Sequence, residues 1–157
     1  MPLDDRSGAS AGSAGVPPGA AGTPALPGTD LGGAIQAWFR NLERCVRDVD
    51  YDTARPLFAD DVVGFGTFGT ILQGIDALAA DQWRNVWPKI DAFSFDLESL
   101  RWGADGALAW AICLWDSLGR QPDGGTFKRP GRATIILRRE DDRWQAVHTH
   151  FSLTPRP

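Results

Sequence analysis

The chain has 157 residues, a net charge of −4 and 43% hydrophobic residues, with 7 Trp and 8 Phe. This length and composition fit a single globular domain with a hydrophobic core. The basic residues are scattered among acidic ones, which argues against nucleic acid as a partner because phosphate binding needs a concentrated cationic surface.

Cysteine usage and hydropathy bear on the compartment. Cys45 and Cys113 lie far apart, in segments expected to form a helix and a buried strand. Two buried free thiols fit a reducing compartment better than a disulfide framework, so we expect a cytoplasmic protein. Apolar runs such as residues 107–115 are too short to span a bilayer, and we find no secretion signal at the N-terminus. We therefore expect no membrane partner.

The N-terminal part of the sequence divides into a tail and a helix. Residues 1–29 are mainly Gly, Ala, Pro and Ser, so burial cannot offset their ordering entropy and we expect a disordered tail. One domain follows over residues 30–154. Asp30 stands at the N-cap of a long helix that we expect to end near Asp50. Apolar residues recur along it at helical spacing: Leu31, Ile35, Trp38, Phe39, Leu42, Val46 and Val49.

The rest of the sequence changes from helical to strand periodicity. A short helical turn over residues 51–58 precedes a β-type run over residues 62–67, and a second amphipathic helix runs from Gly74 to Pro88. From Phe93 onward apolar residues alternate with period 2. We expect strands near residues 93–100, 107–118, 126–139 and 143–153. Helices followed by hairpin-connected strands predict an α+β fold with a curved, mostly antiparallel sheet.

Two segments carry a resemblance to a known family. One is the acidic entry into the first strand, Leu57 to Val63, and the other is Trp144 to Ser152, in which three residues separate the Trp from a His-x-His-x-Ser pattern. Over residues 31–153 the chain resembles the SnoaL-like, ketosteroid-isomerase-like members of the nuclear transport factor 2 superfamily, and in particular their SnoaL-3 or DUF4440-type subgroup. The resemblance implies a cone-shaped open barrel wrapped around the first helix, with a pocket at the wide end and dimerisation through the convex sheet face.

The isomerase residues known in this superfamily are missing. Ketosteroid isomerases use a carboxylate base on the first strand, a tyrosine on the first helix and a protonated aspartate on a later strand. Placing this chain on that pattern puts Gly66, Leu42 and Thr134 at the three positions. Tyr51 is the only tyrosine, and we expect it to be a packing residue. The sequence therefore argues against classical steroid isomerisation.

The last strand provides the candidate catalytic residues, His148 and His150. At period 2 they share a face with Ser152, and the resemblance favours this face as the pocket side. An imidazole can donate or accept a proton near neutral pH, so the pair suits isomerisation, cyclisation or dehydration of a carbonyl compound. The alternative is that both histidines are hydrogen-bonded structural residues.

The neighbouring strand adds candidate ligand-binding residues. Ala133, Ile135 and Leu137 read as a core or dimer face, which leaves Arg132 and Thr134 toward the pocket. Arg132 can bind a carboxylate or an enolate-like oxyanion. The face opposite the histidines, with Val147, Thr149, Phe151, Ile135 and Leu137, is then the candidate interaction surface.

Three further residues are candidates for ligand contact. Trp83 lies on the second helix and Phe68 follows the glycine-broken first strand. Asp116 ends the apolar row Leu108, Trp110, Ile112 and Leu114, where it either joins the pocket or reaches solvent at the strand end. The His-x-His pair also suits zinc, but neither Asp61 nor Asp116 has a spacing that requires it as the third ligand. We expect no metal and no cofactor.

Two hypotheses for function follow. The first is a small-molecule-binding protein with an apolar-walled pocket and the His-x-His-x-Ser pattern at its polar end, with or without acid–base catalysis. The second is a non-catalytic homodimer that binds or scaffolds a partner.

Overall fold

The computed structural model describes residues 30–155, so the predicted tail over residues 1–29 lies outside the described residues. Helix α1 (Leu31–Asp48) begins as expected, because the Asp30 carboxylate accepts a hydrogen bond from the Gly33 N–H at 3.1 Å. The helix ends at Val49, whose left-handed backbone lets its N–H bond to the carbonyls of Cys45 and Val46. The long N-terminal helix of the prediction is therefore confirmed.

The next segments connect α1 to the sheet. Helix α2 (Tyr51–Ala54) and the 3-10 turn η1 (Arg55–Leu57) lead into strand β1 (Phe58–Phe65), and the short strand β2 (Leu72–Gln73) follows. The predicted second helix is divided into four parts, of which the second is a π-helical turn. They are α3 (Ile75–Leu78), η2 (Ala79–Trp83), α4 (Arg84–Val86) and the 3-10 turn η3 (Trp87–Lys89).

The remaining elements are strands, in agreement with the change of period. They are β3 (Ile90–Asp105), β4 (Leu108–Arg120), β5 (Thr126–Lys128), β6 (Gly131–Glu140) and β7 (Arg143–Leu153). The sheet has the order β2-β1-β7-β6-β4-β3, and β5 pairs with β4. Strands β1 and β7 run parallel, whereas the other described pairs are antiparallel. The α+β fold with an open, mostly antiparallel sheet is confirmed.

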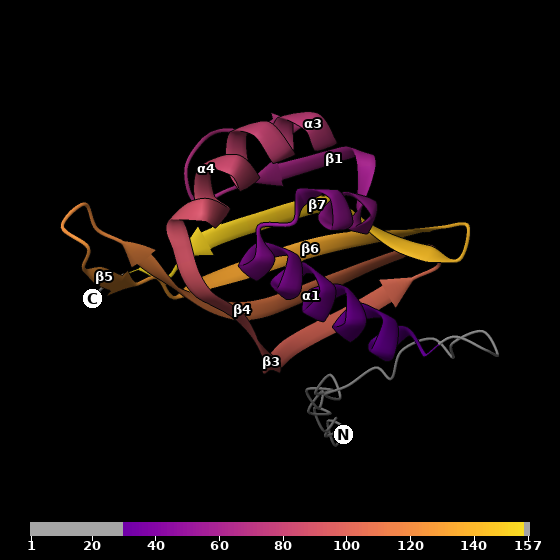
Figure 1. Ribbon diagram of the computed structural model, residues 1–157. Helices are drawn as coiled ribbons and strands as arrows, with labels where there is room; N and C mark the ends of the chain where they lie inside the picture. The colour runs from indigo at the N-terminus through magenta and orange to yellow at the C-terminus, as the bar shows by residue number, and fades with distance from the viewer. Residues whose placement is uncertain (1–29, 156–157) are drawn as a thin grey trace, which may run out of the picture.

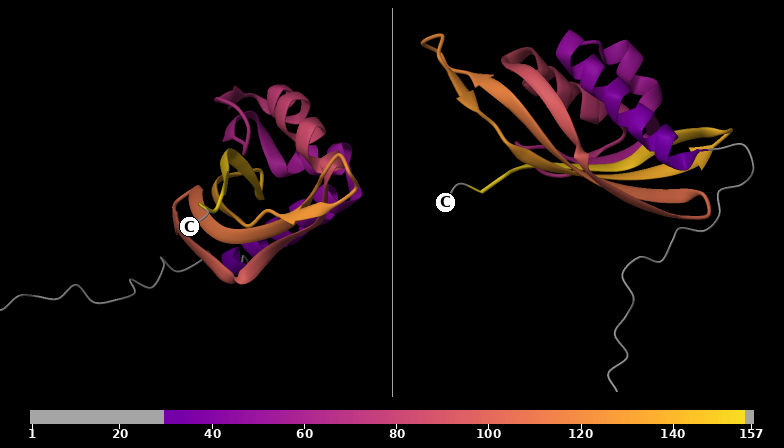
Figure 2. Two further views of the ribbon diagram at one scale, coloured as in Figure 1. Left: turned by 90° about the vertical axis from the view of Figure 1, so that its left-hand side faces the viewer. Right: turned by 90° about the horizontal axis from the view of Figure 1, so that it is seen from below.

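The helices cover one side of this curved sheet. Helix α1 lies across the strands in Figure 1, and the views in Figure 2 show α1 and the segment from α3 to α4 on the same side. We call this side the inner face, with Cys113, Ala133 and Ile135 among its residues. On it, the buried side chains of α1 meet those of the strands to form the hydrophobic core. The opposite side is the outer face.

Polar contacts fix α1 against β3. The Glu43 carboxylate accepts a hydrogen bond from the Phe95 N–H at 2.8 Å, and the Arg47 Nε donates to the Phe93 carbonyl at 2.6 Å. Between these contacts and the strand start, β3 has an irregularity at which Ala92 adopts a φ of 52°. The helix therefore contacts β3 at the interruption of its pairing with β4 and directly after it.

Strand β7 contains a β-bulge that decides which side chains face inward. Ile136 pairs with His148, but the next residue, Leu137, pairs with Ala146, so Val147 is an extra residue in β7. Ala146 is inward-facing and fully buried. Beyond the bulge, Thr149 rather than His148 faces inward. The alternation predicted from Trp144 to Ser152 is therefore broken in the middle of the strand.

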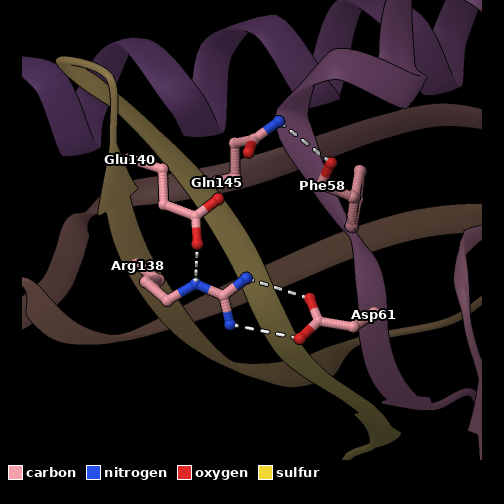
Figure 3. Close-up of polar contacts among 5 residues, drawn as sticks. All are labelled: Phe58, Asp61, Arg138, Glu140 and Gln145. Atoms are coloured by element: carbon pink, nitrogen blue, oxygen red, sulfur yellow. Dashed lines mark hydrogen bonds and ion pairs between the residues drawn. The ribbon is translucent and has the colours of Figure 1, made fainter.

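An ion-pair cluster joins the strands around β7 (Figure 3). Arg138 of β6 donates two hydrogen bonds to the Asp61 carboxylate of β1, at 3.0 and 3.2 Å, and its Nε lies 2.7 Å from Glu140 Oε1. Gln145 of β7 donates from its side-chain amide to the Phe58 carbonyl at 3.2 Å. These contacts fix the parallel strand β1 to the rest of the sheet.

Candidate ligand-binding site

A cavity lies between α1, the segment from η2 to η3, and the inner face of the sheet. Its volume is about 540 Å³ when the space at its open mouth is included. Most of its lining is apolar, with a few polar groups, as is usual for small-molecule sites. The lining residues are Leu42, Val46, Phe58, Thr67, Gln82, Trp83, Val86, Trp87, Ile90, Phe93, Trp115, Arg129, Thr149 and Phe151.

Stacked aromatic rings form one wall of the cavity. The rings of Trp83 and Trp87 stack with their centroids 4.8 Å apart, and Tyr51 stacks on Trp87 at 5.4 Å. Phe58 packs against the other side of Trp83 at 4.9 Å. Tyr51 is thus a packing residue, as its position in the sequence predicts. Trp83, Trp87 and Phe58 therefore give the cavity an aromatic, apolar wall.

Arg129 provides the only ionisable side chain among the described lining residues. It follows β5 and exchanges two backbone hydrogen bonds with Ser117 of β4, at 2.8 and 3.2 Å. Because paired residues in an antiparallel sheet share a face, Arg129 points inward with Ser117. Its guanidinium donates to the hydroxyls of Ser117 at 3.2 Å and Thr67 at 3.3 Å. Burial lowers the pKa of the Arg129 guanidinium.

Besides Arg129, the cavity has two polar groups that have no hydrogen-bond partner among the described residues. They are the indole Nε1 of Trp115 and the Oε1 of Gln82, and both atoms are buried. Two glycines make room for these side chains: a Cβ at position 131 would lie 2.1 Å from the Trp115 ring, and one at position 66 would lie 2.9 Å from the Gln82 amide carbon. The absence of a Cβ at these two positions therefore leaves the space that the indole and the amide occupy.

The residues predicted to form the polar end of the pocket lie together, but on the outer face. Arg132 pairs with Ser152, and Thr134 pairs with His150, which confirms their neighbourhood. None of these residues, nor His148, lines the cavity. The predicted orientation is wrong for two reasons. The bulge at Val147 turns the histidines outward, and the pocket is on the same face as the core rather than opposite to it.

The outward histidines have structural contacts. The Nδ1 of His148 lies 2.9 Å from the Val63 carbonyl, which can only accept, so this nitrogen carries the proton and donates. The ring of Phe65 packs against both imidazoles, with centroid distances of 5.7 Å to His148 and 5.2 Å to His150. These contacts connect β7 to its parallel neighbour β1.

The other predicted contact residues divide between the two faces. Trp83 lines the cavity, and its contact with a ligand stays a prediction. Phe68 is 69% exposed and does not line it. Asp116 belongs to the outer row of β4, where its carboxylate accepts a hydrogen bond from the Ser117 N–H at 2.7 Å. The predicted interaction surface is likewise reversed, because Thr149, Phe151, Ile135 and Leu137 point inward.

The sequence analysis did not predict Arg129 as a site residue, although the sequence contained a signal for its position. Lys128 and Arg129 are adjacent basic residues in the sequence. Arg129, however, pairs with Ser117, which continues the inward row of Ala111, Cys113 and Trp115 on β4. If the pairing of this segment with β4 had been predicted, Arg129 would have been placed on the inner face together with Ser117. Gln82 carried a weaker signal, as an amide within the apolar side of a helix.

The described residues offer no cluster for a metal. Among residues 30–155, no group of three His, Cys, Asp or Glu side chains is placed to hold an ion. Asp61 is engaged with Arg138, whose hydrogen bonds lower the pKa of the Asp61 carboxyl. Cys45 and Cys113 are both buried and free. No helix in the described part of the chain is long and apolar enough to cross a membrane.

Comparison with known proteins agrees with the fold. The family described as "SnoaL-like domain" matches residues 35–157. No curated protein matches the chain.

Solved structures provide three similar folds. An NTF2-like protein of unknown function from Pseudomonas putida KT2440 is 26% identical and has a TM-score of 0.65, covering 78% of this chain and 85% of that one. An NTF2-like superfamily protein from Salmonella enterica has 17% identity, coverage of 80% and 92%, and a TM-score of 0.70. A ketosteroid isomerase-like protein from Erwinia carotovora atroseptica has 15% identity, coverage of 81% and 98%, and a TM-score of 0.68.

Proposed function

The chain belongs to the SnoaL-like domain family, and we propose that it binds a small, flat, mostly apolar molecule in the cavity on the inner face of its sheet. The observation that carries this proposal is the cavity itself. Its aromatic wall is stacked and its polar groups are few, which is the usual composition of a site that recognises a small organic molecule.

Binding is better supported than acid–base catalysis. Isomerisation, cyclisation or dehydration of a carbonyl compound needs a group that transfers a proton at the ligand. The described lining has no carboxylate and no imidazole, and the two histidines predicted for this role lie on the outer face. Arg129 holds its proton at neutral pH and is unsuited to transferring one. We therefore propose a binding protein rather than an isomerase, cyclase or dehydratase.

Tryptophan fluorescence offers a direct test, because Trp83, Trp87 and Trp115 line the cavity. Four probes are used: benzoate, benzamide, 2-naphthoate and 2-naphthamide. We expect at least one to quench the fluorescence saturably and to raise the melting temperature. Val86→Phe, which narrows the cavity, should weaken binding, whereas Ile112→Phe on the outer face should not. If none of the four probes binds, the proposal is wrong.

A second candidate function, homodimer formation, is favoured by the apolar outer row of β4. Leu108, Trp110, Ile112 and Leu114 are 43–50% exposed there, and Trp102 of β3 is 40% exposed. Contiguous apolar side chains on a sheet face usually mark an interaction site. We propose that a second copy of the chain covers this row, in a two-fold arrangement that places the row against itself.

The dimer is tested by light scattering of the full chain. Ile112→Glu puts a charge in the middle of the row, so we expect it to convert a dimer into a monomer. Lys89→Glu changes a charge on the exposed turn η3 and serves as the control. A wild-type chain that is monomeric at high concentration, or a dimer that survives Ile112→Glu, would exclude this surface.

A further inference from the structure

The polar end of the cavity contains a buried cation without an anionic partner. Arg129 is 5% exposed, and none of the ion pairs among residues 30–155 includes it. From this geometry we infer that the ligand carries a carboxylate, which Arg129 binds. The inference rests on the proposed function and makes it narrower: the chain recognises aromatic or similarly flat apolar carboxylic acids.

The unused donors of Arg129 support this inference. A guanidinium has five N–H donors, and the two hydrogen bonds of Arg129 go to the neutral hydroxyls of Ser117 and Thr67. A buried cation that is not paired with an anion is costly, so such groups usually have a charged partner. A carboxylate suits the remaining donors because it can accept two parallel hydrogen bonds from one guanidinium.

Trp115 provides a second donor at the same cavity. Its ring centroid lies 5.7 Å from the Arg129 Cζ, and its buried Nε1 has no acceptor among the described residues. Buried indole N–H groups normally have a partner. An indole N–H without an acceptor, beside a guanidinium that has donors left over, suits an anionic oxygen, whereas a neutral apolar ligand would leave the indole N–H unpaired.

The rest of the lining defines further features of the ligand. Trp83 and Trp87 give this part of the lining an aromatic, apolar surface, which suits an aromatic ring. The unpartnered Oε1 of Gln82 is an acceptor, so a hydroxyl on the ligand would satisfy it. The described lining has no acidic side chain, so none of its groups would repel the ligand's carboxylate.

The test compares each acid with its own amide, which has almost the same shape and no charge. Benzoate is measured against benzamide and 2-naphthoate against 2-naphthamide, by tryptophan quenching at constant ionic strength. For the wild type we expect the acid to bind at least about tenfold more tightly, the effect of a buried charged hydrogen bond. Arg129→Met should abolish this preference while the amide still binds. Arg129→Lys should restore part of it, since the charge returns without the planar fork.

Arg132→Met is the matched control. Arg132 lies on the neighbouring strand β6, on the outer face, so its loss removes the same charge from the sheet but not from the cavity. We expect it to leave the acid preference unchanged. Trp115→Phe, which removes the indole N–H but keeps an aromatic ring, should reduce the preference less than Arg129→Met does.

The outcomes separate the inference from the proposed function. If acid and amide bind equally, or if Arg129→Met keeps the acid preference, the carboxylate inference is wrong and the cavity remains a binding site. If no probe binds the wild type, the proposed function fails and the inference fails with it. Should Arg129→Met not fold, the acid preference of Trp115→Phe and Arg129→Lys decides, and an undiminished preference in both overturns the inference.

Discussion

The two faces of the sheet differ in whether their polar side chains have hydrogen-bond partners within the protein. On the inner face, Arg129, Trp115 and Gln82 stand at an apolar cavity, and the last two have buried atoms without partners. On the outer face, His148 and Arg138 have their partners within the sheet. Unpaired polar groups in a buried place point to a ligand, whereas paired ones at the surface point to structure.

The comparison also concerns apolar residues. Strand β4 alternates buried and exposed positions along its length, and both sets are largely apolar. The buried set belongs to the core, and the exposed set has no cover among the described residues. Alternation therefore identifies which residues share a face, but it does not distinguish a core from an interface.

The largest expected effect is a difference in the free energy of unfolding when an Ile is replaced by Ala on the inner face and on the outer face. Ile135→Ala removes a fully buried side chain and should lower the free energy of unfolding by about 2–5 kcal/mol. Ile112→Ala removes a side chain that is 43% exposed and should cost less than about 1 kcal/mol in the monomer. Urea denaturation measures both, and equal costs would contradict the assignment of the two faces.

A smaller effect is expected for the ion pair on the outer face. Hydrogen bonds from Arg138 lower the pKa of the Asp61 carboxyl below its ordinary value of 3.8. The stabilisation is therefore complete well above pH 3.8 and is lost as the pH falls through and below that value. Because the pair is exposed, Asp61→Asn should cost only about 0.5 kcal/mol at neutral pH.

The pH dependence distinguishes this effect from a general loss of packing. The difference between the wild type and Asp61→Asn should shrink below pH ~4 as the carboxylate is protonated. Thermal melts between pH 3 and pH 7 measure it. A difference that stays constant or grows toward acid pH would contradict the role of Arg138.

The smallest expected effect concerns the histidines. His148→Ala and His150→Ala should leave the affinity for benzoate and 2-naphthoate unchanged within about twofold, because neither residue lines the cavity. His148→Ala should lower stability modestly, since it loses the hydrogen bond to Val63. Titration calorimetry of each variant is the measurement. If a folded His150→Ala protein lost binding, His150 would have to be assigned to the binding site, contrary to this prediction.

Local signals made most of the fold predictable. Asp30 caps α1 as its sequence position indicated, and the helical spacing of the residues after it matches the buried face of the helix. The final strand was predicted over residues 143–153 and forms as β7 (Arg143–Leu153). These elements depend on caps and periodicities that lie within a few residues of each other.

The site was harder to predict because it depends on contacts between distant residues. The single extra residue Val147 reverses the face of every side chain after it, and period 2 alone does not reveal a bulge. Arg129 is brought to the cavity by its pairing with Ser117. Trp83 was predicted to contact a ligand because it lies on the second helix, whose position in the sequence follows from local periodicity.

Indole N–H resonances of tryptophan test most directly which face of the sheet binds the ligand. Trp115 lines the cavity on the inner face, while Trp110 is on the outer face of the same strand. The Phe variant of each residue assigns its signal in a ¹H–¹⁵N spectrum. When benzoate or 2-naphthoate is added, we predict that the Trp115 signal shifts as its N–H gains an acceptor and that the Trp110 signal does not. A shift of Trp110 with Trp115 unchanged would contradict the account.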